Sequence, residues 1–291
     1  MTHLIRPEGP APGDLEVSRR LLGGLLFAGY ASAAVSRAAQ PVTTGDEGLV
    51  TLTTALPAPD GFELPAYVAR PQGEGPFPAV VVVSEIFGVH AYIQDVCRRL
   101  AHEGYAAIAP AFFVRAGDPA PLSDMAQVQA IVAQAGYEQV MGDVSAALDW
   151  LNGQIWADSD RLGITGFCWG GKVVWQAVAR FAAFKAGVAW YGRLAPAEGA
   201  SGGDPWPVDL AADLKAPVLG LYGEQDRGIP LTSVEAMREA LARAGRSDSR
   251  IVVYPGAGHA FHADYRPSYQ AEAARDGWDR MLDHFRANLA S

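Results

Sequence analysis

The amino-acid sequence predicts an α/β fold in which a mostly parallel central sheet carries helices on both faces. Short apolar runs rich in valine are bounded by proline and glycine, as in strands that are buried on both faces. Segments with the apolar spacing of helices follow most of these runs. Strands that alternate with helices need crossover connections, and such connections make neighbouring strands parallel.

The expected elements can be placed one by one along the chain. Strands at 49–56 and 62–70 flank the turn signal Pro59-Asp60-Gly61 and are expected to form a hairpin. Further strands are expected at 79–84, 105–109, 163–167, 187–191, 218–222 and 250–254. Helices are expected at 92–102, from Ser123 onward with a break near Gly136, at 142–151, directly after Cys168, at 233–244 and at 269–289.

Composition limits the classes of protein that this chain can be. Of its 291 residues, 49% are hydrophobic and 19% charged, which suffices for a sizeable core, and residues 46–291 are expected to form one domain. The net charge of −9 and the lack of a basic run make nucleic acid a poor partner. Two cysteines suggest neither a disulfide framework nor a metal site. No stable membrane span is expected in this domain, and a monomer or weak homo-oligomer is predicted.

Residues 1–45 are expected to form an N-terminal tail. Within it, Ser18-Arg19-Arg20-Leu21-Leu22 precedes an apolar, small-residue stretch that contains Ala31-Ser32-Ala33. A twin arginine, a mildly apolar stretch and small residues at the end resemble a twin-arginine export signal, which predicts a periplasmic protein. The alternative is an uncleaved helix that packs on a cytoplasmic domain.

One stretch places a cysteine at a sharp turn between a strand and a helix. Its sequence is Gly163-Ile164-Thr165-Gly166-Phe167-Cys168-Trp169-Gly170-Gly171, which contains the spacing G-x-C-x-G. This spacing is that of a nucleophile elbow with cysteine in place of serine. Its glycines are expected where side chains would clash, and the helix N-terminus favours a thiolate. The alternative is a glycine-rich turn with a buried structural cysteine.

Residues able to do acid–base chemistry follow several other strands. Asp226 and His259 come after the strands at 218–222 and 250–254, so with Cys168 the chain order is nucleophile, acid, base. Ligands of open parallel sheets sit beyond the carboxyl ends of the strands, where these residues should meet. A thiol needs an imidazole to take its proton, and a carboxylate orients that imidazole. Alone, Asp226 could be a turn cap and His259 a solvated side chain.

The sequence resembles the dienelactone hydrolases, or carboxymethylenebutenolidases. The resemblance extends over residues 49–290 and rests on Ser84-Glu85-Ile86-Phe87-Gly88-Val89-His90, Gly104-Tyr105, Ala109-Pro110, Gly166-Phe167-Cys168-Trp169-Gly170-Gly171, Gly223 through Asp226, and Gly258-His259-Ala260-Phe261. It implies an α/β-hydrolase fold and a Cys-His-Asp triad. It further implies hydrolysis of a small lactone or ester through an acyl-thioester, without a cofactor.

The resemblance also implies roles for single residues. The family glutamate, here Glu85, holds the resting thiol and takes its proton once substrate binds. The oxyanion hole would combine the backbone N–H groups of Ile86 and Trp169.

For substrate binding, Arg115 matches a family arginine that binds the substrate carboxylate, and Tyr191 a tyrosine that lines the site. The family's second arginine falls here on Ala263, so Arg266 is the nearest candidate. The expected substrate is therefore a small lactone or ester, most simply a carboxylated one.

Two other interpretations come from the same residues. The chain could be a catalytically silent member of this fold that binds small carboxylates, since fold alone does not fix function. The string His259, His262 and Asp264 contains metal-ligand types, but it lacks a recognised ligand spacing, so no metal site is predicted.

Overall fold

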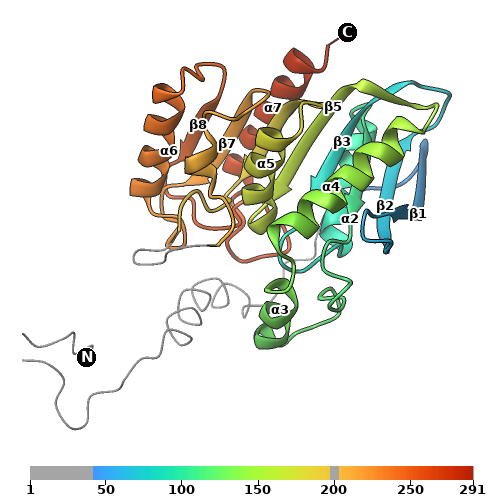
Figure 1. Cartoon of the computed structure of the whole chain (residues 1–291), viewed down its shortest axis with the longest axis horizontal. Coiled ribbons are helices and arrows are strands. Elements are labelled where there is room, and N and C mark those ends of the chain that lie inside the picture. Colours follow the sequence, from blue (N-terminus) through green and yellow to red (C-terminus); the bar gives the residue numbers. More distant parts are fainter. Residues whose placement is uncertain (1–41, 197–202, 291) are drawn as a thin grey trace, which may run out of the picture.

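The computed structural model describes residues 42–196 and 203–290. Its eight strands form one sheet in the order β1-β2-β4-β3-β5-β6-β7-β8 (Figure 1). The first two pairings in this order, β1 with β2 and β2 with β4, are antiparallel, and all the others are parallel. The sheet is thus mostly parallel, as predicted. The predicted export signal lies outside the described residues, as do residues 197–202.

The strands occur where apolar β-prone runs predicted them. They are β1 Leu49–Pro57, β2 Glu63–Pro71, β3 Phe77–Val83, β4 Ala106–Pro110, β5 Ala157–Phe167, β6 Phe184–Trp190, β7 Val218–Gly223 and β8 Arg250–Tyr254. β5 begins six residues earlier than expected. Its first residues pair with Phe77 and Pro78 of β3 before a bulge. The polar Asp158-Ser159-Asp160 hid this part of the strand from the apolar pattern.

The helices also agree with the sequence pattern apart from their ends and from the short 3-10 helix η2, which no pattern predicted. They are α2 Ala91–His102, α3 Met125–Val132, α4 Tyr137–Asn152, α5 Trp169–Arg180, η2 Pro207–Leu210, α6 Leu231–Arg243 and α7 Ala271–Asn288. Asp124 caps α3 by accepting a hydrogen bond from the N–H of Ala126. Gly136 is the N-cap of α4, so the expected break is present, but α4 begins five residues before the predicted start at 142.

Helices cover both faces of the sheet. A side chain at Gly187 of β6 would meet Val174 and Val178 of α5, whereas one at Gly163 of β5 would meet Phe285 of α7. Gly163 and Gly187 lie on opposite faces, because the partner of Gly187 is the next residue, Ile164. Figure 1 accordingly shows α4, α5 and α6 in front of the sheet, with α2 and α7 behind it.

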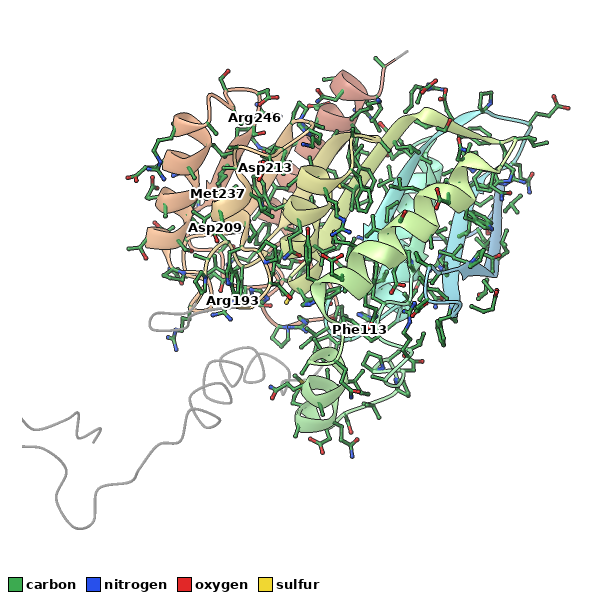
Figure 2. The ribbon with its side chains drawn as sticks, in the orientation of Figure 1. Phe113, Arg193, Asp209, Asp213, Met237 and Arg246 are labelled. Atoms are coloured by element: carbon green, nitrogen blue, oxygen red, sulfur yellow. The ribbon has the colours of Figure 1, made fainter. Side chains whose placement is uncertain are left out.

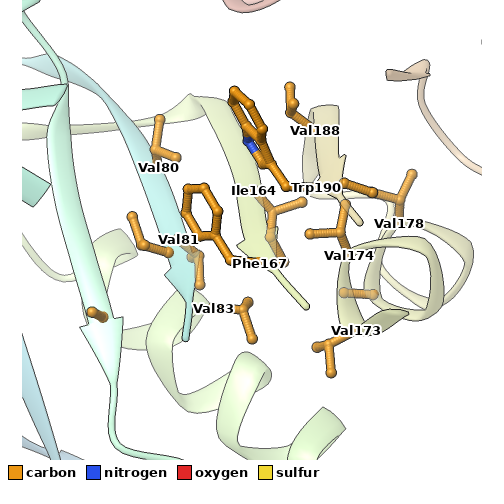
Figure 3. Packing of buried hydrophobic residues seen from close by; sticks show 14 of the residues in the cluster. Val80, Val81, Val83, Ile164, Phe167, Val173, Val174, Val178, Val188 and Trp190 are labelled. Atoms are coloured by element: carbon orange, nitrogen blue, oxygen red, sulfur yellow. The ribbon is translucent and has the colours of Figure 1, made fainter. Parts of the chain in front are cut away.

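The centre of the sheet holds the largest part of the core. Figure 3 shows valines of β3 and α5 around Ile164 of β5, and all of these side chains are buried. Phe167 and Trp190 stack on neighbouring strands with their ring centroids 5.5 Å apart. Because β5 and β6 are fixed by this packing, the loops that leave their carboxyl ends start from rigid positions.

The carboxyl ends of the parallel strands lie along the lower edge in the figures. Figure 2 labels Phe113, which follows β4, and Arg193, which follows β6, at this edge. The fold therefore gathers the loops after β3, β4, β5, β6, β7 and β8 on one side. Among the described helices, none has the length and apolar character needed to cross a bilayer.

Candidate active site

Cys168 occupies the turn between β5 and α5. It is the N-cap residue of α5 and has φ 56° and ψ −114°, in the positive-φ region that side chains rarely adopt. Its N–H donates a hydrogen bond to the carbonyl oxygen of Trp190 at 3.0 Å, which fixes the turn against β6. The turn therefore holds the thiol at the start of a helix and at the carboxyl edge of the sheet.

The glycines around Cys168 are required by close backbone approach, as predicted. A Cβ at Gly166 would lie 2.4 Å from the carbonyl oxygen of Gly170, and one at Gly170 would lie 2.4 Å from that of Val83. A Cβ at Gly171 would lie 2.5 Å from the carbonyl oxygen of Trp190. The start of α5 thus packs directly against the ends of β3 and β6. No residue larger than glycine permits so close an approach.

His259 and Asp226 meet at the same edge. Nδ1 of His259 lies 2.7 Å from Oδ2 of Asp226, whose other oxygen accepts a hydrogen bond from the N–H of Gly228 at 2.8 Å. Burial lowers the pKa of His259, but the charge and hydrogen bond of Cys168, together with those of Asp226, raise it overall to about 10. The imidazole thus interacts with the thiol on one side and with a carboxylate on the other.

Backbone strain is concentrated at this site. Among the described residues, the non-glycine residues with positive φ are Cys168, Tyr191 and Ala260. The ring of Tyr191 packs edge-on to that of His259 with centroids 5.2 Å apart, and Ala260 follows His259 in the chain. Such conformations cost about 1–3 kcal/mol each and persist where the surrounding structure enforces them, most often at functional sites.

Glu85 leaves the end of β3 and is 1% exposed. Its Oε2 accepts a hydrogen bond from the hydroxyl of Tyr265 at 2.5 Å and lies 3.5 Å from Nε2 of His90. Its Oε1 is buried and has no hydrogen-bond partner among the described residues, so the contact with the resting Cys168 thiol that the resemblance implies is not made in this structure. Burial raises the pKa of Glu85, but the Arg266 charge, His90 and Tyr265 lower it overall to about 2, so the carboxylate is ionised.

Sequence reasoning did not find the aromatic groups around Glu85. The ring of His90 stacks on Tyr92 and packs edge-on to Tyr265. The Tyr92 hydroxyl lies 2.5 Å from Nδ1 of His262, which is buried among aromatic rings. No spacing in the sequence links residues 85–92 with 262–265, so only the fold brings them together.

The three residues of the weaker metal hypothesis have separate partners. His259 pairs with Asp226, His262 with Tyr92, and Asp264 with Arg99 at 2.5 Å. Within residues 42–196 and 203–290, no group of three or more histidine, cysteine or acidic side chains is arranged to hold a metal ion. The three side chains of the string H-x-x-H-x-D therefore interact with different neighbours.

Comparison with known proteins identifies the family. The sequence profile of the dienelactone hydrolase family matches residues 64–289. The chain belongs to the dienelactone hydrolase family. It has the α/β-hydrolase fold and is a hydrolase that acts on ester bonds.

Individual relatives cover most of the chain. A Methylorubrum extorquens protein named "Putative carboxymethylenebutenolidase" is 50% identical over 270 residues, 92% of each chain. A Bradyrhizobium protein named "Probable 2-oxo-3-(5-oxofuran-2-ylidene)propanoate lactonase" is 34% identical over 77% of this chain and 89% of its own. The crystal structure titled "Putative Dienelactone Hydrolase" from Klebsiella pneumoniae is 48% identical, covers 81% of this chain and 98% of its own, and has a TM-score of 0.76.

The two arginines expected from the dienelactone hydrolase pattern have different surroundings. Arg115 is bonded to Asp60, with Nε–Oδ2 at 2.8 Å, and to Asp143, with Nη2–Oδ1 at 2.7 Å. Arg266 donates from Nε to the Tyr265 hydroxyl at 3.1 Å, and its charge acts on Glu85. Arg266 is therefore placed at the site. A substrate-binding role for Arg115 stays a prediction that requires the release of two carboxylates.

Tyr191 and the residues of the expected oxyanion hole come from segments around the Cys168 turn. Tyr191 is fully buried against His259, so its observed contact is with the imidazole. Trp169 is the first residue of α5, where N–H groups have no partner within the helix. Ile86 follows the end of β3, which packs on Gly170. Both N–H groups therefore come from segments that touch at the turn.

The two cysteines of this dienelactone hydrolase have unlike environments. Cys97 of α2 is fully buried, and burial raises the pKa of its thiol far above the ordinary range. Cys168 is partly exposed. Because the thiolate is the reactive form, Cys97 is expected to be inert and provides a control cysteine within the same chain.

Proposed function

We propose that this dienelactone hydrolase cleaves small lactones or esters through a covalent acyl-thioester on Cys168. His259 is the acid–base group, and Asp226 orients it. The observation that carries this proposal is the strained Cys168 turn, whose thiol interacts with an imidazole that is itself held at 2.7 Å by Asp226. A structural cysteine would need neither the strained backbone nor a paired imidazole.

The chemical steps follow from these contacts. The thiolate of Cys168 attacks the carbonyl carbon, and the N–H groups of Trp169 and Ile86 stabilise the oxyanion. The ring oxygen leaves with the proton of the His259 imidazolium, which gives the thioester. Neutral His259 then takes a proton from water, hydroxide attacks the thioester, and the acid and the thiolate are released. The net reaction adds one water and, near neutral pH, releases one proton from the new acid.

Glu85 is proposed as the group that takes the thiol proton before attack. It is ionised, and its Oε1 is buried without a protein partner, so this oxygen can accept a proton. After product release the same proton returns to Cys168. A resting thiol is better protected from oxidation than a permanent thiolate, which gives this arrangement a physical advantage.

The proposed substrate carries a carboxylate near the scissile ester. Arg266 is 7% exposed, its Nε points to Tyr265, and its charge acts on both Glu85 and Cys168. An arginine so placed can pair with a substrate carboxylate. The Bradyrhizobium relative is named for a lactone that is also a propanoate, which is the same combination of groups.

The test compares a carboxylated dienelactone with p-nitrophenyl acetate. Wild type, Cys168→Ala, Cys168→Ser and the control Cys97→Ala are assayed on both compounds. We expect Cys97→Ala to keep its turnover and both Cys168 variants to lose about three orders of magnitude or more, as removal of a nucleophile does. Retention of more than about a tenth of the wild-type rate by Cys168→Ala would overturn the proposal.

A preference between the two substrates tests the carboxylate. Faster turnover of the dienelactone than of p-nitrophenyl acetate at subsaturating concentration is expected, and Arg266→Gln should reduce this preference. An equal loss of turnover on both esters in Arg266→Gln would show that the arginine acts within the protein and does not bind the substrate carboxylate.

A further inference from the structure

The carboxylate of Glu85 is held asymmetrically. Its Oε2 has a hydroxyl at 2.5 Å and an imidazole nitrogen at 3.5 Å, while Oε1 has no partner among the described residues. A buried carboxylate usually has both oxygens satisfied, since leaving an acceptor unpaired costs about 1–3 kcal/mol. Oε1 is therefore the oxygen that is left for a further partner. Tyr265 creates this asymmetry because its hydroxyl occupies Oε2.

Tyr265 is suited to this task because it remains a donor. Burial, followed by the Glu85 charge, raises the pKa of Tyr265 well above its ordinary value, so the phenol keeps its proton. The same hydroxyl accepts a hydrogen bond from Nε of Arg266 at 3.1 Å. Arg266, Tyr265 and Glu85 thus form a chain of two directed hydrogen bonds that ends at Oε2.

The loop that carries Tyr265 is fixed from the opposite side by a buried ion-pair network. Asp264 pairs with Arg99 of α2, and Arg99 also pairs with Asp95 at 2.6 Å. Both acids are almost fully buried. Because the residue next to Tyr265 is tied to α2, these ion pairs restrain the backbone at Tyr265.

On this basis we propose that Tyr265 is a positioning residue for Glu85, which occupies Oε2 and leaves Oε1 as the only oxygen that can take the Cys168 proton. The inference rests on the proposed function, since it needs Glu85 to act on the thiol. In the step it serves, the S–H bond breaks and an O–H bond forms at Oε1, while the phenol O–H bond stays intact. The sequence segments that resemble the dienelactone hydrolases do not include this tyrosine.

Other charged and titratable groups face Glu85 and must be considered in any pH profile. They are His90 from the loop after β3, Tyr92 from α2, Tyr191 from the loop after β6, and Arg266 and His262 from the loop after β8. The pKa of His262 is lowered to about 3, first by burial, so this residue stays neutral in the range where activity is measured. His90 is 17% exposed and contacts the same Oε2, so a His90→Gln variant belongs in the same series.

The test is the pH dependence of kcat/KM in Tyr265→Phe, with Tyr254→Phe as the matched control. Tyr254 also donates to a carboxylate, Asp276 at 2.8 Å, but lies at the end of β8 away from Glu85. Loss of the Tyr265 hydroxyl removes a donor from the charged form of Glu85, so the acid limb should move to higher pH. We expect about a tenfold lower kcat in Tyr265→Phe and wild-type behaviour in Tyr254→Phe.

A role that acts through Glu85 must vanish when Glu85 is neutral. In the Glu85→Gln background, Tyr265→Phe should therefore cause no further shift of the acid limb and less than about a twofold change in kcat. Additive effects of the two changes would overturn the inference, as would an unshifted limb in the single variant. If Tyr265→Phe does not fold, Tyr265→Gln keeps a donor on the side chain, and an acid limb near that of wild type is then the expected result. An acid limb displaced from that of wild type in Tyr265→Gln would equally overturn it.

The two proposals fail in different ways. Turnover in Cys168→Ala would refute the cysteine nucleophile, whatever Tyr265→Phe does. Loss of turnover in Cys168→Ala, combined with a wild-type pH profile in Tyr265→Phe, would refute only the role of Tyr265.

Discussion

Asp226 and Glu85 are two buried carboxylates at the same edge of the sheet, and their partners differ. Asp226 is bonded to an imidazole and to one backbone N–H, so both of its oxygens are engaged. Glu85 accepts a hydrogen bond from a phenol on one oxygen, and its other oxygen has no partner within the part of the chain that the structure describes. The comparison teaches that burial alone does not define the task of a carboxylate. A fully bonded one orients its neighbour, and a half-bonded one can accept a proton.

The largest effect should come from Asp226→Asn. An amide at this position can hold the wrong tautomer of His259, so the imidazole no longer faces the thiol with the nitrogen that it needs. We expect kcat to fall by about 10³–10⁴-fold, measured as steady-state hydrolysis of p-nitrophenyl acetate near pH 7. A fall smaller than tenfold would show that the two carboxylates do not differ in the way described.

Glu85→Gln should cost less, because it removes a proton acceptor while the imidazole remains. A decrease in kcat of about 10–10²-fold is expected, at the low end of what general base catalysis contributes. Alkylation of Cys168 by iodoacetamide provides an independent readout, with Cys97 as the unreactive internal reference. If Glu85→Gln were as damaging as Asp226→Asn, the distinction between orienting and accepting carboxylates would be lost.

Substrate charge should separate Arg266 from Arg115. Arg266 is linked to Glu85 through the Tyr265 hydroxyl, whereas Arg115 is paired with Asp60 and Asp143. For a carboxylated lactone, Arg266→Gln should raise KM by about tenfold, the effect of a lost charge-assisted bond. Arg115→Gln should leave KM near wild type and lower the thermal midpoint instead. The reverse pattern would restore Arg115 as the substrate ligand.

The smallest effects are expected in the pH dependence of the free energy of unfolding. Glu85 and His259 stabilise the folded protein over different pH ranges. The pKa of Glu85 is lowered from 4.5 to about 2, so its contribution is present above 4.5 and is lost as pH falls through 2. The pKa of His259 is raised from 6.5 to about 10, so its contribution is present below 6.5 and is lost as pH rises through 10. Urea unfolding across this range should show that Glu85→Gln flattens only the acid side and Asp226→Asn only the alkaline side.

Much of the fold could be predicted because apolar periodicity reports directly on burial. The valine strand β3 and the hairpin of β1 and β2 are where the pattern placed them. The early part of β5 could not be seen, because Asp158-Ser159-Asp160 is a strand segment at the rim and carries no apolar signal. The ends of helices and strands depend on capping residues and bulges, which the periodic spacing of apolar residues does not encode.

The site was predictable where its residues directly follow strands. Cys168, Asp226 and His259 meet because parallel strands end at one edge, so chain position alone brings them together. Arg115 also follows a strand, but its partners Asp60 and Asp143 come from a turn and a helix whose approach the sequence does not reveal. Tyr265 was missed for the same reason, since its contact with Glu85 spans 180 residues of the chain.

The central claim is that a substrate acyl group is carried on Cys168. Rapid quenching of Asp226→Asn with a carboxylated dienelactone, followed by intact-mass and peptide mass spectrometry, tests this most directly, because slow deacylation should let the intermediate accumulate. The account predicts a mass increase equal to the acyl group, located on the peptide that contains Cys168 and absent in Cys168→Ala. Turnover without any adduct on Cys168, or an adduct on Cys97 or another residue, would contradict it.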